Sequence, residues 1–316
     1  MEELLSIGSA ALKTIATNEQ AKQYLLNNKL LYGILRKAAD RYIGGETLEE
    51  TLKKVIQANN RSMKCSIEYM GENINQASEA NAAKDEFLRI CTHIASKELN
   101  STVSLDLSHI GLNVSLELCL ENLMEICSVA SRFGIEVNLS AEGPHQTDNV
   151  LGIYKKASEL TDVLAVTLQA YLYRTREDFD ELKKLPGRIR IVKGAFGTDE
   201  GLSMKRGSQL DTVYLGYIGE LFEIRHKCSI ATHHADIQQE AKKLIDFYHP
   251  DKTDYEFESL YGIQEEGLLQ LQAEGYMTKL YFVYGKEWYL YLCNRLSEYP
   301  LNLFQALADI SNSSSL

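Results

Sequence analysis

The sequence predicts an α/β protein of the (β/α)8 type, a closed barrel of parallel strands with a helix after each strand. After residue 62, short β-branched segments alternate with longer segments of helical periodicity. About eight such units fit within roughly 250 residues, which is the usual size of this barrel. Polar side chains also recur at alternate positions near the ends of several predicted strands. Active sites of this fold lie at the carboxyl ends of its strands.

The first 62 residues have helical spacing and no strand pattern. Gly44-Gly45 interrupts this spacing, and Thr47-Leu48-Glu49-Glu50 has the arrangement of a capping box that begins another helix. The serine-rich end of the chain is typical of a frayed terminus. We therefore expect three parts: an N-terminal helical arm over 1–62, a barrel over 63–308 and a frayed tail over 309–316.

The predicted strands are Cys65–Met70, Thr102–Ser108, Ile135–Leu139, Val163–Leu168, Arg188–Val192, Cys228–Thr232, Tyr255–Glu258 and Lys279–Val283. The clearest predicted helices between them are Val114–Arg132, Asn149–Glu159, Glu177–Lys184, Asp211–Arg225 and Ile237–Tyr248. The alternative is an open, doubly wound sheet. No Gly-x-Gly-x-x-Gly turn follows any of these strands, so the closed barrel is the better prediction.

Composition narrows the possible classes of protein. The 316 residues are 45% hydrophobic and carry a formal net charge of −11, which argues against a nucleic-acid partner and a polybasic membrane surface. The six cysteines contain no Cys-x-x-Cys pair and no metal-ligand spacing, so we expect reduced thiols and no metal site. The sequence has no signal-peptide pattern and no apolar run long enough to span a membrane. A cytoplasmic protein with at most peripheral membrane contact is expected.

The segment Arg190–Phe196 is the most informative stretch. Ile191 and Val192 belong to a buried strand that also contains Arg190, and Lys193 follows directly. Burying cations in an apolar strand is unfavourable unless an anion or a polar ring system meets them. A salt-bridged core strand is the plainer interpretation of this segment alone. Four other strand ends favour a functional site, because polar residues share a parity there: Ser104 and Asp106, Asn138 and Ser140, Thr167 and Gln169, and Glu256 and Glu258.

Six segments, taken in order, resemble the FAD-dependent proline dehydrogenases of the monofunctional bacterial type, whose catalytic domain is a (β/α)8 barrel. The resemblance covers roughly residues 65 to 305. The segments are Val103–Leu107, Leu168–Leu172, Arg190–Phe196, Ile230–His234, Tyr255–Gly262 and Tyr281–Glu298.

The resemblance implies FAD as the cofactor. A guanidinium such as that of Arg190 can donate to the flavin ring and stabilise negative charge on it after reduction. Lys193 and the amides around Gly194 suit the diphosphate or the ribityl chain. Taken singly, His233 could instead be an ordinary histidine of the barrel rim. The cofactor contacts that the resemblance implies are Gln169, Arg190, Val192, Lys193, Gly194, Ala195, Thr232, His233 and His234.

The resemblance places the substrate at the last helix and the barrel mouth. Tyr291, Asn294, Arg295 and Glu298 have the spacing of one helix face. The other implied substrate contacts are Tyr281, Leu260, Phe196 and Ser140, and the implied catalytic residues are Arg190, Arg295 and Asp106.

Several of these positions depart from the family pattern. Asn294 replaces an arginine that binds the substrate carboxylate, Asp106 replaces a lysine, Ser140 replaces an aspartate and Phe196 replaces a tyrosine. The formal charge of the pocket becomes more negative by roughly two charges, which disfavours a carboxylate. The changes could also compensate one another, if Asp106 pairs with Arg295 or Arg190.

The expected activity is hydride transfer from L-proline to the flavin N5, giving pyrroline-5-carboxylate in proline catabolism. The electrons would pass to a quinone-type acceptor. Two alternatives remain open at this point. The first is a flavoenzyme that oxidises a different cyclic or secondary amine, and the second is a non-catalytic barrel.

Overall fold

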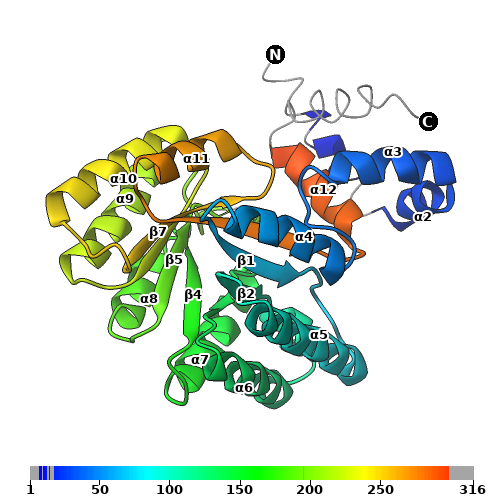
Figure 1. Ribbon diagram of the computed structural model, residues 1–316, viewed down its shortest axis with the longest axis horizontal. Helices are drawn as coiled ribbons and strands as arrows, with labels where there is room; N and C mark the ends of the chain where they lie inside the picture. The colour runs from blue at the N-terminus through cyan, green and yellow to red at the C-terminus, as the bar shows by residue number, and fades with distance from the viewer. Residues whose placement is uncertain (1–6, 9, 13, 15–17, 195, 299–316) are drawn as a thin grey trace.

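The computed structural model describes residues 7, 8, 10–12, 14, 18–194 and 196–298. Eight parallel strands form one closed barrel in sequence order, and the eighth pairs with the first (Figure 1). The strands are β1 (Lys64–Tyr69), β2 (Ser101–Leu105), β3 (Val137–Leu139), β4 (Leu164–Gln169), β5 (Arg188–Val192), β6 (Cys228–Ala231), β7 (Tyr255–Leu260) and β8 (Thr278–Tyr284). The predicted (β/α)8 fold is confirmed.

Helices surround the barrel on the outside (Figure 1). Those between strands are α5 (Ala77–Ser96), α6 (Leu116–Arg132), α7 (Thr147–Ser158), α8 (Thr175–Leu182), α9 (Ser208–Glu223), α10 (Ala235–Tyr248) and α11 (Glu265–Ala273). Before β1 come α2 (Glu19–Asn27), α3 (Lys29–Ala39) and α4 (Leu48–Asn59), and α12 (Trp288–Glu298) follows β8. Helices α2, α3 and α12 gather beside the barrel (Figure 1), and α3 contacts both α2 and α12, so helices from opposite ends of the sequence lie together.

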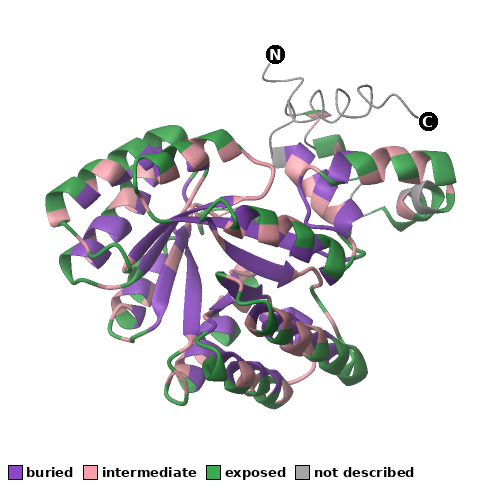
Figure 2. Ribbon diagram, viewed as in Figure 1, coloured by how far each residue is buried: buried purple, intermediate pink, exposed green. Residues whose placement is uncertain are grey.

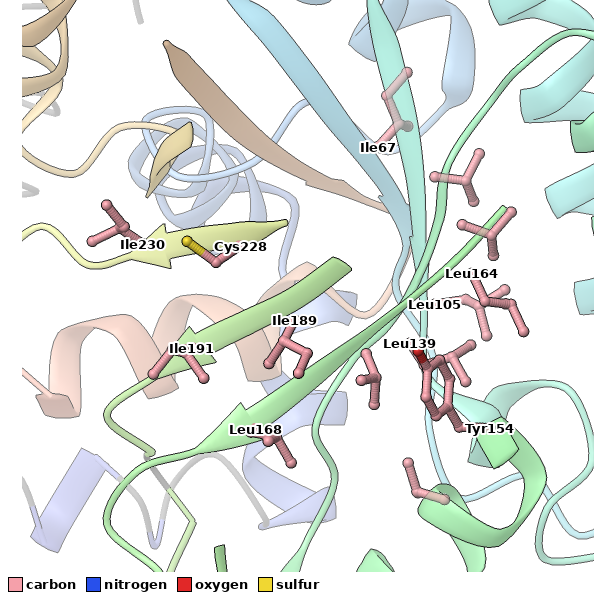
Figure 3. Packing of buried hydrophobic residues seen from close by; sticks show 14 of the residues in the cluster. Ile67, Leu105, Leu139, Tyr154, Leu164, Leu168, Ile189, Ile191, Cys228 and Ile230 are labelled. Carbon is pink, nitrogen blue, oxygen red and sulfur yellow. The ribbon is translucent and has the colours of Figure 1, made fainter. Parts of the chain in front are cut away.

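The core lies between the strands and the surrounding helices. Most residues on the outward face of the strands are apolar and belong to this core, as Ile67, Leu105, Leu139 and Ile191 do (Figure 3). Strand residues are buried almost throughout, while the helices expose their outer faces (Figure 2). This alternation follows from the two-residue period of a strand.

The other strand residues fill the barrel lumen with polar groups. The hydroxyl of Ser104 lies 2.8 Å from that of Ser66, and Asn138 donates to Ser104 at 3.4 Å and to Thr167 at 3.3 Å. All four are buried. The predicted inward parity of Ser104, Asn138 and Thr167 is therefore confirmed.

The carboxyl ends of two strands differ from the predictions by more than one residue. The second strand stops at Leu105 because Leu107–His109 forms a 3₁₀ turn, whose Ser108 amide donates to Glu142 at 2.9 Å. The seventh strand continues to Leu260, because its backbone still pairs with β8 there.

Thr47 caps α4 as predicted, accepting from the Glu50 amide at 3.3 Å. Helix α4 packs against β1 and β8, and Leu48, Leu52 and Val55 belong to the barrel core. The boundary after residue 62 stays a prediction, and the tail over 309–316 lies outside the described residues.

All six cysteines are buried and unbridged. Across residues 18–194 and 196–298 with the short pieces before them, no helix is long and apolar enough to cross a membrane. In the same described part of the chain, no cluster of His, Cys, Asp and Glu has the arrangement of a metal site.

Candidate active site at the carboxyl ends of the strands

Arg190 occupies the centre of the polar rim. It lies on β5, and its Nε donates to Glu258 of β7 at 2.5 Å. Its Nη1 reaches the Thr167 hydroxyl at 3.5 Å, and its guanidinium carbon lies 4.9 Å from the ring centroid of Tyr281. Three neighbours on three different strands therefore fix the orientation of this guanidinium.

A buried ion network continues below Arg190 inside the lumen. Lys279 Nζ lies 2.8 Å from Glu258 Oε2 and 2.5 Å from Glu256 Oε1, and all three side chains are almost completely buried. The pKa values of both glutamates are lowered. Burial favours the neutral form of each glutamate, but nearby positive charges outweigh it. At Glu258 these charges are those of Arg190 and Lys279. At Glu256 they are those of Lys279, Lys64 and Arg188.

Lys279 belongs to this region, although the sequence did not predict it as a site residue. The sequence did indicate that Lys279 faces inward, because Lys279 and Tyr281 are two residues apart on β8 and therefore lie on the same face of the strand. A lysine near the start of a strand can equally lie at a solvent-exposed strand end. The strand period therefore did not show that Lys279 is buried or that its partners are Glu256 and Glu258.

Lys193 lies at the rim between two neighbouring elements. Its Nζ is 2.6 Å from Asp211, in the first turn of α9, and 3.1 Å from His234 Nδ1. The Thr232 hydroxyl accepts from the His234 amide at 3.1 Å, which fixes the turn after β6. The ends of β5 and β6 thus bring Lys193, Thr232 and His234 together, and their contact with a cofactor stays a prediction. Asp211 was not predicted as part of this group.

Gly194 has a positive φ of 106°, and a Cβ added there would lie 2.1 Å from the ring of Tyr171. This turn therefore requires glycine. The Gly194 carbonyl accepts from Arg206 at 3.0 Å, and the Phe196 carbonyl accepts from the Tyr171 hydroxyl at 3.0 Å. The Phe196 side chain is exposed. Ala195 lies outside the described residues.

Gln169 is buried at the end of β4, and its amide donates to the Glu142 carbonyl at 3.0 Å. Its neighbour across the sheet is Val192 on β5. The predicted residues Gln169, Arg190 and Val192 therefore lie at adjacent strand ends.

A cluster of carboxyl groups faces Arg190 across the mouth. Glu68 accepts from the Ser140 hydroxyl at 3.2 Å, and that hydroxyl lies 3.3 Å from the Tyr281 hydroxyl. Burial raises the pKa of Glu68 to about 7, against the opposing influence of Arg190 and Ser140. Glu68 was not predicted as a site residue, although its parity on β1 matches that of the other inward residues.

Asp106 belongs to the same carboxyl cluster. Burial and repulsion from Glu68 and Glu142 raise its pKa well above the ordinary value, although Arg190 favours the charged form. The pKa of Glu142 is also raised, mainly by burial. The raised pKa of Asp106 favours its neutral form, which works against the extra negative charge counted from the substitutions. Arg190 forms its ion pair with Glu258, which leaves the predicted pairing of Asp106 with Arg190 without support.

The last helix closes one side of the mouth. The Arg295 guanidinium lies 5.0 Å from the ring centroid of Tyr291. The pKa of His233 is lowered to about 4 because the protein desolvates its ring and the charges of Arg295 and Arg206 oppose protonation.

Leu260 packs in a second apolar cluster that contains Tyr281 and Leu292, while Asn294 is partly buried. Helix α12 ends at Glu298, whose side chain lies outside the described residues.

The rim fits a flavin dinucleotide by the chemistry of its donors. A flavin dinucleotide has a diphosphate, a hydroxyl-rich chain and a ring that gains negative charge on reduction. Two cations, Arg190 and Lys193, and the amide of Gln169 come from the adjacent strand ends of β4 and β5. Cations and an amide at one edge suit an anionic ligand with a hydrogen-bonding ring.

The larger of two cavities lies away from this rim, at the opposite ends of the strands. It has a volume of about 450 Å³ and is lined by the starts of the strands, including Lys64, Ser101 and Glu136. None of the predicted site residues lines it. A much smaller one, of about 20 Å³, is lined by Glu142, Thr167 and Gln169. We place the site at the rim because the polar groups converge there, and not at the larger cavity.

Comparison with known proteins identifies the family. The family described as proline dehydrogenase matches residues 51–302. Proline dehydrogenase 1 of Bacillus subtilis (strain 168) is 33% identical over 291 residues, which cover 88% of this chain and 94% of that protein. Proline dehydrogenase 2 of the same organism is 32% identical over 268 residues, covering 85% and 88%.

Solved structures agree on the fold. Proline utilization A (PutA) from Bdellovibrio bacteriovorus superposes with a TM-score of 0.80 at 19% identity. The match covers 98% of this chain and 38% of that longer one. A PutA from Bradyrhizobium japonicum gives a TM-score of 0.70 over 87% of this chain and 31% of its own length. This chain belongs to the proline dehydrogenase family of flavin-dependent oxidoreductases.

Proposed function

We propose that this protein is an FAD-dependent enzyme that oxidises L-proline. FAD, when bound, would accept hydride at N5 from the carbon beside the proline nitrogen, giving pyrroline-5-carboxylate. The observation that carries the proposal is the fixed position of Arg190 at the rim, held by Glu258, Thr167 and the ring of Tyr281. The relatives at 32–33% identity are both named as proline dehydrogenases, which supports the same reaction here.

In this proposal the rim of β4, β5 and β6 holds the cofactor. Arg190 donates to the ring edge, Lys193 and the amides after β5 contact the diphosphate or ribityl chain, and Gln169 contacts the ring. Thr232, His233 and His234 contribute from the turn after β6. A positive charge at the ring edge stabilises the negative charge that reduction places there.

The substrate contacts in this proposal come from the opposite side of the mouth. Arg295 pairs with the proline carboxylate, and the Tyr281 ring packs against the pyrrolidine. A protonated carboxyl group is a hydrogen-bond donor, so Asp106 can donate to a substrate carboxylate that it would otherwise repel. In this proposal, the raised pKa of Asp106 favours the neutral form that can make this hydrogen bond.

The comparisons do not favour the two alternatives, a different amine substrate and a non-catalytic barrel. A quinone-type electron acceptor and a cytoplasmic location remain predictions from the sequence.

The proposal is tested by turnover. Purified protein loaded with FAD is incubated with L-proline and a soluble quinone, and the product is identified by mass spectrometry. The same assay includes pipecolate and pyrrolidine, which enlarge the ring and remove the carboxylate respectively. Formation of pyrroline-5-carboxylate with proline as the preferred substrate supports the proposal. Turnover of pyrrolidine with none of proline would refute it.

A further inference from the structure

The ion pair between Arg190 and Glu258 connects the rim to the interior of the barrel. Arg190 Nε and Glu258 Oε1 are 2.5 Å apart, and the Glu258 side chain is almost fully buried. Lys279 contacts the other carboxylate oxygen at 2.8 Å. Glu258 is therefore held between two cations, one above it at the rim and one below it in the lumen.

Glu258 carries a fixed negative charge in this position. The attraction of Arg190 and Lys279 keeps its pKa below the ordinary value in spite of burial. A fixed carboxylate in contact with Arg190 offsets part of the positive charge that the guanidinium presents to its other neighbours. It also occupies Nε, so only the two Nη groups remain to donate toward the mouth.

The charge next to a flavin ring influences its reduction potential. A positive group at the ring favours the negatively charged reduced form, and an anion behind that group weakens the effect. The effect of a cation on the reduction potential therefore depends on its counter-ion, which offsets part of the positive charge and fixes the orientation of the cation.

We propose that Glu258 is a positioning residue that sets the reduction potential of the bound flavin through Arg190. Lys279 supports it by holding the second carboxylate oxygen. The inference rests on the proposed function, since it requires the flavin ring to lie against Arg190. Glu258 lies in the lumen and contacts Arg190 and Lys279. Its role in this proposal is to orient Arg190 and to neutralise part of its charge.

The chain contains a matched control for this proposal. Glu256 lies two residues earlier on the same strand, faces the same lumen and is equally buried. It pairs with Lys279 at 2.5 Å and with Lys64 at 3.0 Å. Its other polar partners among the described residues are Arg188 and Ser229, and Arg190 is not one of them. Glu258→Gln and Glu256→Gln thus remove the same charge from the same lumen, and only the first removes it from the Arg190 pair.

The experiment measures the flavin midpoint potential of the parent and both variants by anaerobic titration against redox dyes. Removing the Glu258 charge leaves Arg190 more positive toward the ring. We expect Glu258→Gln to shift the reduction equilibrium toward reduced flavin by at least tenfold, which is about 30 mV for a two-electron couple. Glu256→Gln should give a much smaller shift. Glu258→Asp retains the carboxylate and should stay close to the parent.

A second variant protects the test against misfolding. Glu258→Gln leaves Lys279 with one partner fewer, so the double variant Glu258→Gln/Lys279→Gln removes the two opposite charges together. It should show a smaller rise in potential than the single variant, because the positive charge of Lys279 is lost together with the negative charge that offsets Arg190. Equal potentials in the parent and in whichever of these two variants folds would overturn the inference, as would equal shifts from Glu258→Gln and Glu256→Gln. A parent protein that binds no FAD would overturn the proposed function and this inference with it.

Discussion

Arg190 of β5 and Glu258 of β7 form an ion pair across the barrel lumen, although β6 lies between their strands. Side chains of non-adjacent strands meet only because the barrel is closed and both residues face inward. The pair joins the rim, where the cofactor is proposed to bind, to the buried network of Lys279 and Glu256.

Replacing Arg190 tests its proposed role at the flavin ring. Arg190→Gln removes the positive charge from the rim, and Lys279 still balances Glu258. We expect the rate of flavin reduction by proline to fall by about 10²–10³-fold, the usual effect of removing a donor at a site of developing charge. The rate is measured by stopped-flow absorbance. Arg176→Gln, which removes an arginine from the helical surface, serves as the control and should retain the parental rate.

Restoring the family residues at the mouth tests the altered substrate pocket. Asp106→Lys and Asn294→Arg should each lower KM for L-proline by about 10–100-fold, because a charged hydrogen bond contributes about 1.5–3 kcal/mol. The measurement is steady-state turnover as a function of proline concentration. A higher KM in both variants would show that this pocket does not receive the carboxylate of proline.

The pKa of Glu68 predicts a pH dependence of ligand binding. Glu68 is protonated below pH 7 and ionised above it, so its negative charge opposes a bound carboxylate only on the alkaline side. Tetrahydro-2-furoate has the ring and carboxylate of proline without an ionisable amine. Its Kd should rise by about tenfold as the pH increases through 7, which corresponds to about 1.4 kcal/mol of repulsion.

Glu68→Gln provides the comparison for that titration. The amide cannot ionise, so the variant should bind tetrahydro-2-furoate with a Kd that changes little between pH 6 and 8. A parental profile that is equally flat would contradict the assignment of this carboxyl group to the ligand pocket.

The lumen network predicts a large effect on stability. Lys279→Met leaves Glu256 and Glu258 with fewer counter-charges in a buried region, and we expect a loss of about 3–5 kcal/mol in the free energy of unfolding. Urea denaturation monitored by circular dichroism measures it. Lys243→Ala removes one member of an exposed ion pair with Glu240 and should change the same quantity by less than about 1 kcal/mol.

Acid should weaken the same network. Since the folded-state pKa values of Glu256 and Glu258 are lowered, their contribution to stability is present above the unfolded-state value of 4.5 and is lost as the pH falls below it.

The sequence predicted the fold well because its signals were local. The boundaries of β5 were predicted as Arg188–Val192 and are the same in the structure, since β-branched residues fill that strand and Pro186-Gly187 precedes it. Strand parity also placed Thr167 and Gln169 on the inward face. These features depend on the two-residue period of a strand, which is visible in a single chain.

The partners of the charged residues could not be predicted in the same way. The contact of Arg190 with Glu258 joins residues 68 positions apart, and that of Lys64 with Glu256 joins residues 192 apart. Such pairs depend on the register of all the intervening strands. The raised pKa values of Glu68 and Asp106 were also hidden, because they arise from burial and from mutual repulsion in the folded barrel.

The most direct measurement of the central claim is an anaerobic absorbance titration of the FAD-loaded protein with L-proline. The account predicts that the protein binds FAD and that the visible band of the oxidised flavin disappears as proline is added. A protein that cannot be loaded with FAD, or one whose flavin band persists at saturating proline, would contradict it.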